Sequence, residues 1–306
     1  MRRRILYSVT LPLSTALLFG LVSFAGAVSL SPTTFELSAN PGDKIVNYIR
    51  VYNDQDIPIG VTMEIENFTA SGEEGRVVIE KSEETSNFSL ASWVRVTPTD
   101  FTIAPHSFHQ VEYTVSVPLK AEPGGHYGSI LVTVVGAGTN GTGLGISQKL
   151  ASLLLLNVAG QVKEGMLVRD FSAPAFSEYG PVNMVARFEN TGSIHLKPRG
   201  FVIIKNLFGK QVAQLDIPQS NILPETVRRV EIPWTEKYSF GKYEATLTAI
   251  YGSTNEPLTS SVSFWVIPWK IASVVLLAVL LLIFIFYRSR RRIGLAFRIL
   301  FKGDAR

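Results

Sequence analysis

The residues of this chain with the most obvious chemical capacity lie in one short segment, FENTGSIHLKPRG, residues 188–200. Its asparagine and glycine are typical of a tight turn between strands, and a glutamate, a histidine, a lysine and an arginine surround them. The segment could be a small active site or the corner of a β-sheet. The similar segment VYNDQDIPIGV, residues 51–61, keeps the asparagine and the isoleucine but lacks the histidine and the lysine. We therefore interpret residues 188–200 as a sheet corner, with His195, Lys197 and Arg199 on the solvent face of an edge strand that includes Pro198.

A second candidate is a metal site, because His106-x-x-His109 and His126 are potential ligands. The segments QVEYTVSVP and GSILVTVVG are expected to form a hairpin with LKAEPGGHY at its tip. At about 3.3 Å per residue, His126 would then lie more than ~25 Å from His106. The remaining two histidines are too few for a structural metal ion, so no metal site is predicted.

Other catalytic or cofactor motifs are weak. GAGTNG, residues 136–141, matches G-x-G-x-x-G, but the dinucleotide fingerprint requires a βαβ unit, and here we expect a flexible loop before a final strand. The chain has no cysteine, no G-K-[ST] and no G-x-S-x-G, so no cofactor, no catalytic residue and no enzymatic activity are predicted. Trp93, Tyr127 and Tyr238 could stack on sugars or anchor a partner, or could equally belong to a core.

Both ends of the chain carry membrane signals. Residues 1–27 combine an arginine-rich start, an apolar run and an A-x-A site, which predicts a cleaved signal peptide, with an uncleaved anchor as the alternative. Residues 267–287 are apolar and bounded by aromatic residues, as in a transmembrane helix. The basic tail, residues 288–306, predicts a cytoplasmic C-terminus, hence a single-pass type I protein of the plasma membrane with its domains outside.

The charge distribution agrees with this topology. The whole chain has a formal net charge of +4, but residues 28–269 contain 18 Lys and Arg against 24 Asp and Glu. The excess of positive charge therefore lies at the membrane flanks, and nucleic-acid binding is not expected. Because the exported part has no cysteine, it must fold by burial of apolar surface alone.

The exported part consists of short segments rich in valine, isoleucine and aromatic residues, bounded by turn residues. No long amphipathic helix pattern precedes the membrane segment. The expected fold is all-β: two tandem Ig-like antiparallel β-sandwiches followed by a single transmembrane α-helix.

An internal repeat supports two domains of one fold. Arg50-x-x-Asn53-x-x-x-Ile57 recurs as Arg187-x-x-Asn190-x-x-x-Ile194. I-x-P followed by V-E recurs at residues 103–112 and 222–231, and GHYGSILVTVVG is echoed by GKYEATLTAIYG. The predicted domains are residues 28–160 and 161–266. The first contains an acidic insertion, ASGEEGRVVIEKSEETSNFS, expected to be an added hairpin or loop that is either solvated or used for recognition.

The segments SPTTFELSANPGDKIVNYIRVYNDQDIPIGVTMEI and APHSFHQVEYTVSVPLKAEPGGHYGSILV resemble the bacterial WxL-interacting surface protein family. The resemblance implies a peptidoglycan-binding domain, a second, host-binding Ig-like domain and a C-terminal membrane helix. It transfers no binding residue, so the ligand-binding residues stay unknown.

We therefore expect a non-enzymatic, membrane-anchored bacterial surface protein that binds cell-wall glycan or another surface protein. Two alternatives remain open. One is an extracytoplasmic chaperone or assembly factor that pairs strands at an open sheet edge of the first domain. The other is the ectodomain subunit of a membrane complex.

Overall fold

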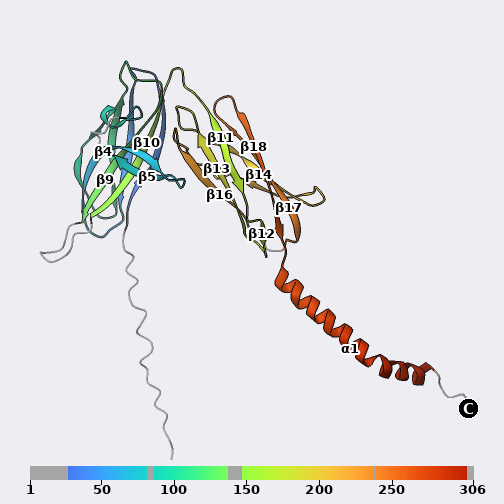
Figure 1. Ribbon diagram of the computed structural model, residues 1–306. Helices are drawn as coiled ribbons and strands as arrows, with labels where there is room; N and C mark the ends of the chain where they lie inside the picture. The colour runs from blue at the N-terminus through green and yellow to red at the C-terminus, as the bar shows by residue number, and fades with distance from the viewer. Residues whose placement is uncertain (1–26, 81–85, 137–146, 237–238, 302–306) are drawn as a thin grey trace, which may run out of the picture.

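The computed structural model describes residues 27–80, 86–136, 147–236 and 239–301. Residues 1–26 of the expected signal peptide, the GAGTNG loop after Gly136 and Tyr238 lie outside these residues. Figure 1 shows two β-sandwiches side by side, with helix α1 leaving the second sandwich. The predicted all-β fold with one C-terminal apolar helix is confirmed.

The first sandwich packs a four-stranded sheet, in the order β1-β3-β8-β6, against a sheet in the order β2-β10-β9-β4-β5. Strand β7 and the short 3-10 helix η1 belong to the same unit, and β7 pairs with β4. The elements are β1 Val28–Ser31, β2 Thr34–Ala39, β3 Lys44–Asn53, β4 Ile59–Ser71, β5 Arg76–Glu80, η1 Ala91–Trp93, β6 Val94–Thr97, β7 Asp100–Ile103, β8 Ser107–Ser116, β9 Gly124–Gly136 and β10 Ser147–Val158.

The second sandwich packs the sheet β11-β13-β16 against the sheet β12-β18-β17-β14-β15. A single helix, α1, follows it. The elements are β11 Met166–Ser172, β12 Phe176–Ser177, β13 Val182–Asn190, β14 Arg199–Asn206, β15 Gln211–Asp216, β16 Val227–Trp234, β17 Gly241–Tyr251, β18 Glu256–Val266 and α1 Trp269–Phe301.

The two sandwiches share one topology. In each sandwich, the first strand pairs antiparallel with a neighbour in one sheet. The second strand crosses to the other sheet and pairs parallel with the last strand of the sandwich: β2 with β10, and β12 with β18. Alternate residues along these strands are buried, so each unit closes over its own apolar core. The internal repeat of the sequence is therefore a repeat of the whole fold.

Buried asparagines explain the repeated motif. Asn53 and Asn190 end the third strand of each unit and are fully buried. Each donates its side-chain amide to backbone carbonyls of two separate loops, which ties those loops together. The acceptors are the isoleucines of the repeated motifs: Ile57 and Ile103 in the first unit (2.9 and 3.2 Å) and Ile194 and Ile222 in the second (both 2.8 Å). The motif is therefore structural.

The acidic segment of the first unit is a hairpin as predicted, but it is not the added part. Strand β5 pairs with β4, and the second unit has the same hairpin in β14 and β15. The elements without a counterpart are η1, β6 and β7. The repeated motifs match no residues between Ile57 and Ile103 in the first unit, so the sequence could not show which part of this interval is added.

One further expectation differs from the structure. The predicted hairpin of β8 and β9 is wrong: β8 lies between β3 and β6, and β9 lies in the other sheet between β4 and β10. Their connection, which contains two prolines, crosses from one sheet to the other. The predicted apolar span forms helix α1 from Trp269 onward, and the helix continues through the basic segment to Phe301.

Candidate binding groove between the two sandwiches

The two sandwiches are joined by a small apolar contact. Leu223 of the second unit is buried against Phe68, Tyr127 and Leu155 of the first. The Tyr127 ring also meets the ring of His195 edge-to-face, with 5.8 Å between centroids. Tyr127 is thus a buried contact residue, and burial raises the pKa of its hydroxyl.

Backbone contacts align the units at two points. The amide of Gly125 donates to the carbonyl of Ser193 at 2.8 Å, and a side chain at neighbouring Gly124 would meet the same carbonyl at 3.1 Å. At the second point, the amide of Arg229 donates to the carbonyl of Glu73 at 2.6 Å. Glu73 lies in the β4–β5 turn, so this acidic loop of the first unit docks on the second.

Side-chain ion pairs join the two units beside both of these backbone contacts. Lys197 Nζ and Asn221 Nδ2 donate to Glu36 Oε1 at 2.6 and 2.7 Å, and the hydrogen bond from Lys197 is the main reason why the pKa of Glu36 is lowered. Arg187 Nε donates to Glu73 Oε2 at 2.6 Å. Sequence reasoning missed Glu36, because nothing in a single glutamate on a strand indicates a partner 161 residues away.

The segment 188–200 therefore forms a turn and also contacts the first sandwich. The turn is confirmed, with the amide of Gly192 donating to Asn190 Oδ1 at 2.8 Å. The expected solvent face is confirmed for Arg199, which is exposed, while Lys197 is half-buried. It is wrong for His195, which is only 9% exposed, and burial lowers its pKa to about 4. The expected edge strand is also wrong, since β14 begins at Arg199 and pairs on both sides. A strand pattern could not reveal that a second domain covers this corner.

The other sequence candidates are separate. His106 contacts Asp56 at 2.9 Å, and the ring of His109 lies 4.5 Å from that of Phe101. His126 is buried, with Nε2 within 2.9 Å of the carbonyl of Glu122, and its ring packs at a tilt against that of Trp93. Within the described ranges, no three His, Asp or Glu side chains are grouped to hold a metal ion.

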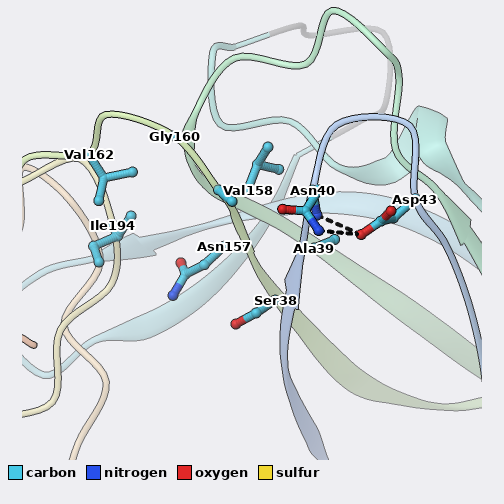
Figure 2. Close-up of a pocket in the computed structure, with 10 residues that line it drawn as sticks. Ser38, Ala39, Asn40, Asp43, Asn157, Val158, Gly160, Val162 and Ile194 are labelled. Carbon is cyan, nitrogen blue, oxygen red and sulfur yellow. Dashed lines mark hydrogen bonds between the residues drawn. The ribbon is translucent and has the colours of Figure 1, made fainter.

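Three hollows follow the junction between the units. The first, of about 410 Å³, lies between the β2–β3 turn and the interdomain linker, and Figure 2 shows Asn40 bonded to Asp43 at its rim. The second, of about 430 Å³, is polar and includes Glu36 and Lys197. Adjacent hollows share lining residues: Asn157 and Ile194 line the first two, and Gln219 and Asn221 line the second and third.

The third hollow, of about 310 Å³, is less polar than the second and opens beside an edge strand. Phe68, Leu155 and Leu223 form its wall, and Arg228 lines it without an ion-pair partner in the part of the chain that the structure describes. Val77 of β5 forms its rim. The hollow thus connects the groove with β5.

Strand β5 is an open edge with apolar side chains. It pairs only with β4 among the described residues, and Val77, Val78 and Ile79 are 43, 43 and 39% exposed. Exposed edges normally carry charges that prevent strand pairing. Here charged residues, Arg76 and Glu80, stand only at the two ends of the strand. The chemistry available in this region is therefore pairing with an extended chain.

Comparison with known proteins identifies no family for the chain: no family model and no curated protein matches it. Solved structures with similar architecture include the CupB2 chaperone of Pseudomonas aeruginosa, at 12% identity and a TM-score of 0.40, covering 77% of this chain and 100% of that one. Another is the Salmonella enterica SafB chaperone in complex with the SafA pilin, at 14% identity and a TM-score of 0.39, covering 77% of this chain and 96% of that one. A third is the E. coli chaperone DraB, at 15% identity and a TM-score of 0.35, covering 78% and 95%. At these values the likeness concerns the β-sandwich architecture, and we take no ligand or residue role from it.

Proposed function

We propose that this protein is a non-enzymatic, membrane-anchored binding protein that holds an extended segment of a partner polypeptide against β5. The observation that carries the proposal is the open edge of β5, with three consecutive exposed apolar residues beside the third hollow. Main-chain hydrogen bonds to such an edge supply affinity, and neighbouring hollows that accept side chains supply specificity. This is the activity expected of an extracytoplasmic assembly factor.

The anchor in this proposal is α1. Residues Trp269–Arg288 have a mean hydropathy of 2.7, and none of this stretch is buried against the rest of the molecule. Its length of 20 residues corresponds to about 30 Å of helix, the thickness of a bilayer core. Four arginines follow within residues 288–292. The positive-inside rule then places the C-terminus in the cytoplasm and both sandwiches outside.

The groove favours a polypeptide over a glycan. Sugar sites commonly use an exposed aromatic ring as a stacking platform. The residues that line the polar second hollow include no aromatic residue except His195, which is buried against Tyr127. Peptidoglycan binding remains an expectation from the sequence resemblance, and it can be tested separately by co-sedimentation of the protein with insoluble peptidoglycan.

A peptide-binding experiment tests the proposal. The full chain in phosphatidylcholine nanodiscs is titrated with a fluorescent, end-blocked peptide of alternating valine and threonine, and binding is followed by anisotropy. Hydrogen exchange of residues 76–80 should slow in the bound state. The substitution Val78→Lys should weaken binding by about tenfold or more, equivalent to about 1.4 kcal/mol, because an edge lysine opposes strand pairing.

The matched control is Val212→Lys on β15, the corresponding hairpin strand of the second sandwich. Val212 is 44% exposed and also lies on a sheet edge, but no residue of β15 lines the third hollow, whereas Val77 of β5 does. Affinity should stay within about twofold of the unmodified chain. Equal effects of the two substitutions, or unchanged exchange of β5 at saturating peptide, would contradict the proposal.

A further inference from the structure

Large exposed apolar side chains gather at one end of the second sandwich. Outside α1, and within the residues that the structure describes, five large apolar side chains are more than 55% exposed. One, Leu119, lies in the first sandwich. The other four are Tyr179 (59%), Leu207 (67%), Phe208 (89%) and Phe240 (74%).

Strand register places these four together. Asn206, at the end of β14, is the Cα partner of Tyr243 near the start of β17, and Gly241 is the partner of Val266. Ser177 also pairs with Val266. The loops that carry the four side chains therefore surround the end of β18, and the chain enters α1 three residues later.

Two of these loops are built so that the apolar side chains face outward. At the β14–β15 tip, Asn206 Oδ1 accepts hydrogen bonds from the amides of Phe208 and Lys210 (3.1 and 3.0 Å), which fixes the turn. Gly209 adopts a φ of 74° there. Near β17, the Tyr243 hydroxyl contacts both the amide and the carbonyl of Phe240 (3.1 and 3.2 Å). The exposure is thus part of an ordered structure.

The start of α1 is tied to the same end. Lys270 Nζ contacts Glu178 Oε2 at 2.7 Å. A hollow of about 470 Å³ lies between the loops and the helix, lined by Tyr179, Phe240, Pro268 and Ile271 among others. Ile271 belongs to the apolar stretch of α1. The apolar loops and hollow are therefore continuous with the surface that α1 would present to lipid.

We propose that this end of the second sandwich rests on the bilayer, with Tyr179, Leu207, Phe208 and Phe240 in the headgroup layer and lipid filling the hollow. Aromatic side chains favour this layer because it offers both apolar and polar contacts. The inference rests on the proposed membrane anchoring. Its consequence is that the second sandwich lies between the membrane and the first sandwich, so it holds the groove and β5 away from the bilayer (Figure 1).

The experiment uses the full chain, which contains no native cysteine, in phosphatidylcholine nanodiscs. Single substitutions Lys210→Cys, Thr254→Cys and Leu280→Cys receive an environment-sensitive fluorophore, and lipids that carry a spin label near the headgroup or deeper in the chain quench it. Lys210 flanks Phe208, Thr254 lies in the β17–β18 turn at the opposite end, and Leu280 lies within α1. We expect shallow quenching at position 210 several-fold above that at 254, and deep quenching at 280.

Adding Phe208→Ser and Phe240→Ser to the Lys210→Cys chain should lower quenching at position 210 toward the level at 254. The inference is overturned if position 280 is quenched while 210 resembles 254, or if the serine substitutions change nothing. If neither position 210 nor position 280 is quenched, α1 is not in the bilayer, and both the proposed anchoring and this inference are wrong. The two failures are therefore distinguishable.

Discussion

Acidification should loosen the junction between the sandwiches through His195. Its pKa falls from 6.5 to about 4 because burial against Tyr127 disfavours the charged ring, with Glu36 opposing and Lys197 adding to the shift. A histidine whose folded pKa is depressed contributes stability in full above pH 6.5, and this stability is lost as the pH falls toward 4. From these two values the loss between pH 7 and pH 5 is about 2 kcal/mol.

The assay is urea unfolding of the unmodified chain and of His195→Phe at both pH values. Unfolding is followed by tryptophan fluorescence, to which Trp234, buried in the second core, contributes. Phenylalanine keeps the edge-to-face contact and cannot titrate. The variant should lose about 2 kcal/mol less than the unmodified chain between pH 7 and pH 5. His195→Gln serves as a second, polar and non-titrating variant and should give the same reduction.

The pH window excludes the neighbouring carboxylate. The pKa of Glu36 is lowered from 4.5, so the stability that Glu36 contributes is present above that value and is lost only as the pH falls below it. A His195→Phe chain that loses as much stability as the unmodified chain between pH 7 and pH 5 would refute the reasoning. The buried ring would then not be the group that titrates.

Three other substitutions test the contacts described above. Asn190→Ala removes three buried hydrogen bonds and should destabilise the second sandwich by about 3 kcal/mol. Asn53→Ala should destabilise the first sandwich in the same way. If either substitution raises amide hydrogen exchange equally in both sandwiches, the two cores are not independent. Leu223→Ala should lower the free energy of unfolding by about 2–3 kcal/mol and speed hydrogen exchange of the Gly125 amide. An unchanged exchange rate at Gly125 would show that the apolar contact does not hold the junction. Glu36→Gln breaks a partly exposed ion pair and should lower the free energy of unfolding in urea by no more than about 1 kcal/mol at pH 7. A larger loss would mean that the pair is better shielded from water than its exposure indicates.

Much of the fold could be predicted from sequence because its signals are local. Alternating apolar residues and turn residues specify strands within a few positions, and the repeated Asn and Ile positions mark the same buried hydrogen bonds in both units. The β8–β9 hairpin was predicted wrongly because short distance along the chain does not decide whether two strands share a sheet. In a sandwich, a connection of a few residues can equally cross to the opposite layer.

The candidate site could be predicted only in fragments. The sequence singles out the acidic loop, Tyr127 and His195 separately, but no pattern indicates that they meet at one junction. The open edge of β5 was equally hidden, because a valine-rich strand reads the same whether it is central or at an edge.

The amino-acid sequence by itself determined two repeated β-sandwich units, an apolar C-terminal helix and a core that forms without disulfides, since each depends on residue types at short, regular spacing. Only the tertiary structure decided that residues 188–200 face the first sandwich, that the acidic turn binds the second, and that β5 pairs on one side alone among the described residues. The contacts between the sandwiches join residues far apart in the chain, such as Glu36 and Lys197, which are 161 positions apart. Their chemistry exists only after the two units have folded and met.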